Sequence, residues 1–243
     1  MSKLDLEDPE FIKKQKELLR MTRFPDTECR LPEEVLYRFP SADLGCFRLA
    51  FSPNGRYLAA ACTYANSKTV IKIYNVEDGV LKYTIKAHKN IVHDIDFTPN
   101  SLYLVTCSSD FTAKLWKLPY PELNDEIEED DSEKYMHVCT LLHPSYVYGA
   151  KFFIDEDESR LIIATACFDT KVRFWRVDFE YGRYSRHDVV SENVVSYDGV
   201  QPDKFVNLLE HRHPNCLKFD NQGRLYIGDS IGCVHVWDIQ VMS

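Results

Sequence analysis

Residues 87–116 read AHKNIVHDIDFTPNSLYLVTCSSDFTAKLW, and residues 142–175 read LHPSYVYGAKFFIDEDESRLIIATACFDTKVRFW. Both segments carry the same four residue types in the same order. The first segment holds His88, Thr106, Asp110 and Trp116, and the second holds His143, Thr165, Asp169 and Trp175. In both, Thr precedes Asp by four positions, Asp precedes Trp by six, and a Phe follows the His by nine. Repetition with fixed spacing indicates a fold built from equivalent units.

These residue types suit a chain of hydrogen bonds in a half-buried sheet. An indole N–H only donates, Thr and His can donate and accept, and an ionised Asp only accepts. We predict that Trp116 donates to Thr106, and Thr106 to His88. His88 would then donate to Asp110, which ties an outer strand to the next unit. The second segment is predicted to form the equivalent network.

A His–Asp pair beside a hydroxyl is also what a catalytic triad contains. A triad needs an exposed nucleophile, whereas Thr106 and Thr165 fall in predicted strands. We therefore interpret both sets as structural hydrogen-bond networks and predict no catalytic residue.

The spacing resembles that of WD40 repeats, whose blades are four-stranded sheets arranged around a channel. Two weaker repeats flank the pair. In the first, FSPNGRYL (51–58) echoes FTPNSLYL (97–104), and Tyr74 stands where Trp would. The last repeat ends on Trp237 and has Ile231 at the Asp position. The predicted fold class is all-β: a WD40 β-propeller with four recognisable blades, preceded by a short N-terminal helix.

The chain is expected to divide into a lead-in over 1–39 and WD40 repeats over 40–241. The lead-in includes a predicted helix at 8–22, because Asp8 can cap it and Pro9 suits its first turn. Four blades are at the low end for a propeller, so we expect a partial or truncated ring. The blades are expected at about 40–79, 80–119, 135–178 and 205–240.

Composition limits the function classes. The 243 residues are 44% hydrophobic, which is ample for a core, and no apolar run is long enough to insert into a membrane. The net charge is −9, but eight of the acids lie between residues 122 and 133. The rest is nearly neutral and lacks the basic face that nucleic-acid binding needs. The acidic run 122–134 and the polar connection 179–204 are predicted loops, and the second is a candidate contact site.

Cysteine usage indicates a reducing cytoplasmic compartment. The eight cysteines form no CxxC pair, and several fall in predicted strands, where a reduced Cys acts as a small apolar residue. His211, His213 and Cys216 have a spacing that could suit a metal ion. His211, however, stands about where the network His of its repeat belongs, so we predict no metal and no cofactor.

Beyond the repeat pattern, residues 35–241 resemble the jouberin family of ciliary WD40 scaffold proteins. The resemblance rests on LGCFRLAFSPNGRYLAAAC (44–62), HKNIVHDIDF (88–97), SSDFTAKLWK (108–117), HPSYVYGAKF (143–152), CFDTKVRFWRV (167–177) and GDSIGCVHVW (228–237). It implies a non-catalytic adaptor in cilium assembly at the transition zone and basal body, with ciliary proteins of these structures as partners.

Loops just before each inner strand are the expected partner-binding positions of such a scaffold. The candidates are Lys89, Asn90, Ser145, Tyr146 and Asn215. One alternative is a substrate receptor of a cullin-type ubiquitin ligase, but no repeat ends in the Trp-Asp-x-Arg that such receptors often carry. Phosphoinositide binding is a weaker alternative, because the chain has no FRRG motif. A generic WD40 binding module is a further alternative.

Overall fold

The computed structural model describes residues 35, 37–39, 42–118, 136–154, 160–178, 206–208 and 212–238. The chain divides into two units, Met1–Arg38 and Phe39–Ser243, and all the strands described below belong to the second. The predicted helix at 8–22, the acidic run 122–134 and the connection 179–204 lie outside the described residues.

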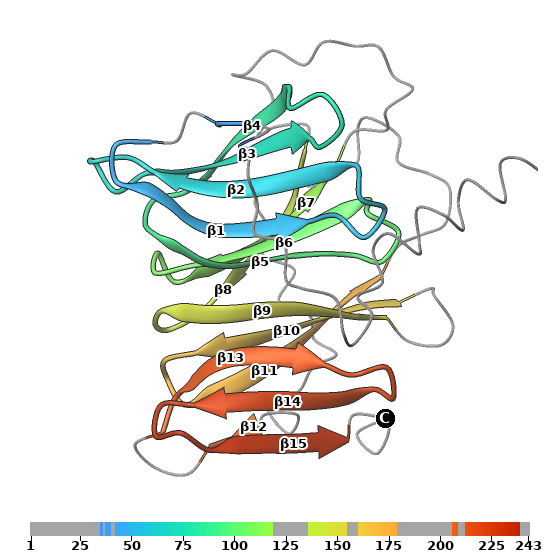
Figure 1. Ribbon diagram of the computed structural model, residues 1–243. Helices are drawn as coiled ribbons and strands as arrows, with labels where there is room; N and C mark the ends of the chain where they lie inside the picture. Colours follow the sequence, from blue (N-terminus) through green and yellow to red (C-terminus); the bar gives the residue numbers. More distant parts are fainter. Residues whose placement is uncertain are drawn as a thin grey trace, which may run out of the picture. The chain divides into compact units, whose positions relative to one another are not determined.

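The described part of the second unit is all-β and forms four antiparallel sheets, as the WD40 propeller prediction requires (Figure 1). Sheet A contains β1 (Gly45–Phe51), β2 (Tyr57–Thr63), β3 (Thr69–Asn75) and β4 (Leu81–His88). Sheet B contains β5 (Val92–Phe97), β6 (Tyr103–Ser108), β7 (Thr112–Lys117) and β8 (His137–Leu142). Sheet C contains β9 (Val147–Ile154), β10 (Arg160–Cys167), β11 (Lys171–Asp178) and β12 (Val206–Asn207). Sheet D contains β13 (Pro214–Phe219), β14 (Arg224–Asp229) and β15 (Val234–Asp238).

The two hairpins whose sequences echo each other close in the same way. The hydroxyl of Ser52 donates to the side chain of Asn54 over 2.7 Å and accepts the backbone N–H of Tyr57. Thr98 donates to Asn100 over 2.7 Å and accepts the N–H of Tyr103. Such side chains replace backbone partners in turns. The repeated Ser/Thr-Pro-Asn sequence therefore reports a repeated turn.

The sheets stack in chain order, and their first strands β1, β5, β9 and β13 contact one another in turn (Figure 1). Three apolar cores fill the spaces between successive sheets. The middle strands β6 and β10 are consequently buried on both faces, and the outer face of β2 is buried under Phe39 and Ala42. This explains why YLAAACT (57–63) and RLIIATAC (160–167) are nearly continuous runs of small and apolar residues rather than alternating ones.

Each sequence repeat contributes to two sheets. The repeat at about 80–119 supplies β4 to the outer edge of sheet A, and then β5, β6 and β7 to sheet B. In the same way, β8 precedes β9 in sequence but belongs to sheet B. Each shared outer strand links neighbouring sheets through the backbone, so the sheets are offset from the sequence repeats by one strand.

We expect the outer strand β4 to be a major source of this linkage. Ile85 of β4 is fully buried between sheets A and B. Ile85→Ala should lower the free energy of unfolding by about 2–5 kcal/mol because it leaves a cavity. The exposed Lys82→Ala on the same strand should change it by less than ~0.5 kcal/mol. Urea unfolding of both variants measures these changes in the free energy of unfolding. Equal changes would show that burial of Ile85 does not stabilise the packing between sheets A and B.

Candidate functional site

The first polar network joins the end of β4 to sheet B. The indole N–H of Trp116 donates to the Thr106 hydroxyl over 2.9 Å. That hydroxyl lies 2.8 Å from Nε2 of His88, and Nδ1 of His88 lies 3.0 Å from the carboxylate of Asp110. Because the carboxylate only accepts, Nδ1 of His88 donates to Asp110. The structure therefore brings these four side chains together in the predicted order.

Asp110 also closes the β6–β7 turn. It accepts the backbone N–H groups of Lys89 and Thr112 and the hydroxyl of Thr112. Burial alone would raise the pKa of this carboxyl, but the hydrogen bond and charge of His88, with the other donors, lower the pKa well below its usual value. The carboxylate is thus an ionised anchor between the β4–β5 connection and the next turn. Thr106 and His88 are buried, so this His–Asp pair offers no open nucleophile.

The second network is completed differently, and the prediction for Asp169 is wrong. Trp175 donates to Thr165 over 2.8 Å, and Thr165 lies 2.8 Å from Nε2 of His143, as in the first network. Nδ1 of His143, however, donates to the backbone carbonyl of Leu141 over 3.0 Å. Asp169 instead pairs with Arg173 through both of its oxygens.

The two Asp residues have different partners because the residue four positions after each Asp differs. Arg173 presents a planar fork that matches a carboxylate with two parallel hydrogen bonds. The equivalent residue of the first network is Lys114, whose ammonium lies over the Trp116 ring at 5.5 Å from its centre. Asp110 is therefore left for His88. His143, without a carboxylate, has its pKa lowered to about 4, because burial disfavours its charged form and Arg173 adds positive charge.

The flanking repeats use other contacts. Tyr74 is buried at the position of the network Trp and stacks on Phe39, with ring centres 4.3 Å apart. In sheet D, Asp229 accepts a hydrogen bond from Nε2 of His235 over 2.9 Å and the backbone N–H of Cys233. Asp229 thus organises the β14–β15 turn, and Arg212 of the preceding connection lies 3.8 Å from its carboxylate.

A charged cluster that the sequence reasoning missed ties three sheets together. The carboxylate of Asp94 in β5 pairs with Arg48 of β1 at 3.0 Å and with Lys151 of β9 at 2.8 Å. Asp96 accepts the backbone N–H of Phe152, and burial raises the pKa of its carboxyl. An alignment of the repeats on the phenylalanines of their first strands would have indicated this charged cluster. Residues two positions apart in a strand point to the same face, so the alignment shows which charged residues of neighbouring first strands can meet.

One edge of the stack carries an aromatic surface that spans sheets B, C and D. It lies at the left of Figure 1, where the β6–β7 and β10–β11 turns meet the connections into β9 and β13. We use the name aromatic surface for His93, Phe111, Tyr146, Tyr148, Phe168 and His213. Neighbouring rings lie between 4.5 and 6.5 Å apart, and Phe111, Tyr146 and Phe168 are exposed. Contiguous exposed apolar surface marks interaction sites.

The backbone at Phe111 is costly for such a residue. Its φ is 69°, in the left-handed region, where the equivalent turn of sheet D has Gly232 at φ 89°. A bulky L-residue there costs roughly 1–2 kcal/mol. The side chain nevertheless remains exposed against Tyr146, with ring centres 5.3 Å apart. Ser67 in the β2–β3 turn and Thr170 in the β10–β11 turn are left-handed as well, so the conformation belongs to the repeated turn and the exposed ring is what distinguishes Phe111.

Of the predicted partner-binding residues, one lies within the aromatic surface and the others lie at different places. Tyr146 lies at the centre of the aromatic surface, and the backbone carbonyl of Ser145 accepts from the Cys167 thiol at 3.6 Å. Lys89 is exposed beside the first network, while the side chain of the half-buried Asn90 accepts the N–H of Ile91. Asn215 is exposed in β13 and has no ring contact among those described. The sequence reasoning missed Phe111, Phe168 and His213, although aromatic residues at equivalent turns were a visible signal.

The described residues contain no group of three or more His, Cys, Asp or Glu side chains that could hold a metal ion. His213 stacks on Phe168, and His211 of the candidate metal motif lies outside the described residues. Where the structure describes the chain, it holds no helix long and apolar enough to cross a bilayer.

Comparison with known proteins agrees with this geometry. Residues 79–117 match the family model of the WD domain, G-beta repeat. Mouse jouberin is 34% identical over 231 residues, which is 95% of this chain and 19% of the mouse protein, and rat jouberin gives the same figures. The nuclear distribution protein nudF of Aspergillus flavus is 29% identical over 67% of this chain and 32% of its own length. The chain thus spans about a fifth of the length of the jouberins it matches.

The two networks should differ in their dependence on the Asp. Asp110→Asn should lower the free energy of unfolding by about 2 kcal/mol, because it weakens hydrogen bonds to a charged, partly buried group. Asp169→Asn should cost less than ~1 kcal/mol, because its main partner is Arg173 and both side chains of that pair are partly exposed. Denaturant unfolding of both variants decides this. Equal losses would mean that His143 depends on Asp169 after all.

Acid should destabilise the chain through His143. The unfolded chain binds a proton at this side chain near its ordinary pKa of about 6.5, whereas the folded chain does so only near pH 4. Stability is therefore complete above pH 6.5 and falls as the pH drops towards 4, by about 3 kcal/mol from this group. Burial also lowers the pKa of His93 and His137, so the test is the difference between wild type and His143→Gln. Identical pH profiles in calorimetry would contradict the assignment.

Proposed function

We propose that this WD40-repeat chain is a non-catalytic scaffold that binds other proteins. Nearly all of the chain, 95% of its residues, aligns with a part of jouberin. The observation that carries the proposal is the aromatic surface. It consists of side chains from sheets B, C and D, which are held in place by packed cores and buried polar networks. Rigid display of exposed rings supports binding, because the rings lose little conformational entropy when a partner covers them.

The chemistry of the networks supports binding over catalysis. In the first network each polar group already has its partner inside the protein, and Thr106 is buried beneath Trp116. A hydroxyl that must serve as a nucleophile has to reach solvent or substrate. The buried His and Thr side chains thus stabilise the frame, and the neighbouring exposed rings make the contacts.

A finer proposal concerns where the scaffold acts. By similarity to jouberin, we assign it a role in cilium assembly, with partners at the transition zone and basal body and a cytoplasmic location at the base of the cilium. The similarity to jouberin supports this role. The aromatic surface supplies the binding site through which such partners would be held.

Phe111→Gly separates binding from stability. Gly adopts a φ of 69° without strain, so the variant should be as stable as wild type or up to ~1 kcal/mol more stable. It should nevertheless lose most of its partner binding, as should Tyr146→Ser. Val80→Ser is the matched control, because Val80 is an exposed apolar residue in the β3–β4 turn at the opposite edge.

Quantitative affinity purification of the tagged variants from ciliated cells provides the readout. The proposal predicts recovery of transition-zone and basal-body proteins with wild type and Val80→Ser, and at least a several-fold loss with Phe111→Gly and Tyr146→Ser. Unchanged recovery with both aromatic variants would contradict the site. Recovery of cullin adaptors in place of ciliary proteins would contradict the ciliary role and favour a ubiquitin-ligase receptor.

A further inference from the structure

The aromatic surface lies between two basic side chains. Lys89 is exposed beside the β6–β7 turn that carries Phe111, and its backbone N–H donates to Asp110 of that turn. At the other end, Arg212 directly precedes His213, and its side chain is 28% exposed. One cation is therefore found at the sheet B end of the aromatic surface and one at the sheet D end.

Both cations have capacity for a further anion. Within the described part of the chain, the ammonium of Lys89 makes no ion pair. The guanidinium of Arg212 lies 3.8 Å from the carboxylate of Asp229 and 3.9 Å from the sulfur of Cys233, and both of these long contacts use the same nitrogen, Nη1. An arginine side chain has five N–H donors. Most of the donor capacity of Arg212 is thus not used by the described residues.

The acids at this edge of sheets B, C and D already have partners inside the protein. The three turns contain Asp110, Asp169 and Asp229, whose side chains are 10%, 20% and 0% exposed. Their hydrogen-bond donors include, in the same order, His88, Arg173 and His235. Among the described residues of these turns and connections, no carboxylate is left for a cation. A basic partner would therefore meet positive charge at both ends of the surface, and like charges disfavour binding.

The tyrosines add hydrogen-bond donors to the positive charge. Tyr146 and Tyr148 have ring centres 6.5 Å apart, and neither phenol hydroxyl forms a hydrogen bond with a residue that the structure describes. A phenol hydroxyl can donate to a carboxylate, and an ionised carboxylate only accepts. The edge thus combines exposed rings with O–H and N–H donors, which is the complement of a segment that carries both apolar and acidic side chains.

We propose that the aromatic surface binds an extended acidic segment of a partner protein, with apolar side chains over the exposed rings and Asp or Glu at both ends. One acid would meet Lys89 and the other Arg212. The inference rests on the proposed protein-binding function of this surface. Ring centres lie 5.3 Å apart from Phe111 to Tyr146 and 6.1 Å apart from Tyr146 to Phe168. An extended chain advances ~3.3 Å per residue, so about two residues match each step and about seven cover the surface.

Selection from a display library of random seven-residue peptides tests the proposal with the full chain. Peptides that bind wild type but not Phe111→Gly should be enriched in Asp and Glu on both sides of apolar residues. The double variant Lys89→Glu, Arg212→Glu should bind these peptides at least several-fold more weakly, because repulsion replaces attraction. In its own selection it should enrich Lys and Arg at the same peptide positions.

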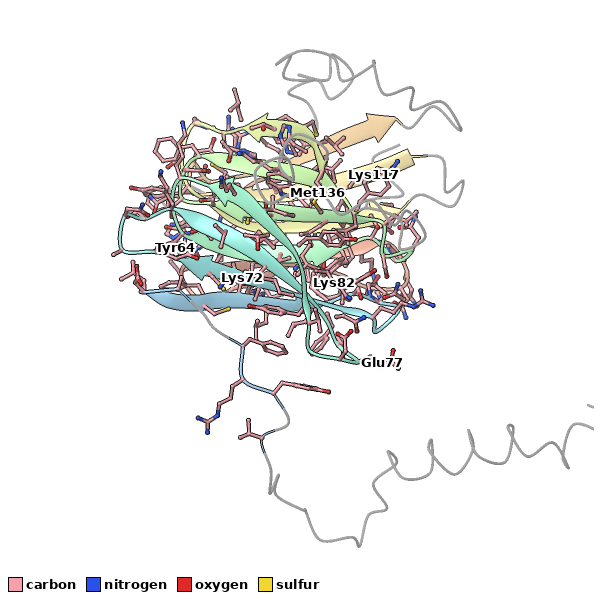
Figure 2. The ribbon with its side chains drawn as sticks, turned by 90° about the horizontal axis from the view of Figure 1, so that it is seen from above. Tyr64, Lys72, Glu77, Lys82, Lys117 and Met136 are labelled. Carbon is pink, nitrogen blue, oxygen red and sulfur yellow. The ribbon has the colours of Figure 1, made fainter. Side chains whose placement is uncertain are left out.

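Lys68→Glu is the matched control. Lys68 is exposed in the β2–β3 turn of sheet A, outside the aromatic surface. Figure 2 looks onto sheet A, with Tyr64 of this turn at the same edge and Glu77 of the β3–β4 turn at the opposite edge. The control should select and bind the same peptides as wild type. Thermal unfolding checks that the variants fold, and Lys89→Gln with Arg212→Gln is a milder pair that should also weaken binding.

The outcomes separate this inference from the proposed function. Peptides that depend on Phe111 but are neutral or basic would overturn the acidic partner and leave the aromatic surface as a protein-binding site. Acidic peptides that the double variant binds as tightly as wild type would do the same. A selection that yields no peptide dependent on Phe111 would contradict binding at the aromatic surface itself, and the inference with it.

Discussion

The structure depends on sheet-to-sheet packing. A blade of this kind has two apolar faces, and the middle strands of sheets B and C are buried because a neighbouring sheet covers each face. Two devices hold the neighbours in place. The backbone of one repeat supplies the outer strand of the preceding sheet, and buried polar contacts cross the junctions, through His88 between sheets A and B and through Asp94 between sheets A, B and C. Because buried polar groups are costly when unpaired, these contacts also select one alignment of the sheets.

The same constraint determines what the protein can present to partners. Turns at the edge of a rigid stack keep their positions, so exposed side chains there can be placed without a large loss of entropy on binding. The aromatic surface has this property at the meeting point of three sheets.

Sequence reasoning predicted the features that repeat. The spacing of His88, Thr106, Asp110 and Trp116 implied both the sheets and the order of the hydrogen bonds, because each residue type has a limited set of donor and acceptor roles. It failed where a single nearby residue competes, as Arg173 does for Asp169. It also missed contacts between aligned positions of different repeats, such as Asp94 with Arg48, and the ring cluster around Tyr146. These depend on how far the sheets approach one another, and the spacing within one repeat does not carry that information.

The central claim is that this chain acts by binding proteins at its aromatic surface. Site-specific photo-crosslinking in ciliated cells tests it most directly, with the photoreactive residue placed at position 146, or at the exposed position 222 in the β13–β14 turn of the opposite edge. The account predicts that position 146 gives discrete adducts with ciliary proteins, that Phe111→Gly abolishes them, and that position 222 gives none. Adducts from position 222 alone, or adducts at 146 that Phe111→Gly leaves unchanged, would contradict it.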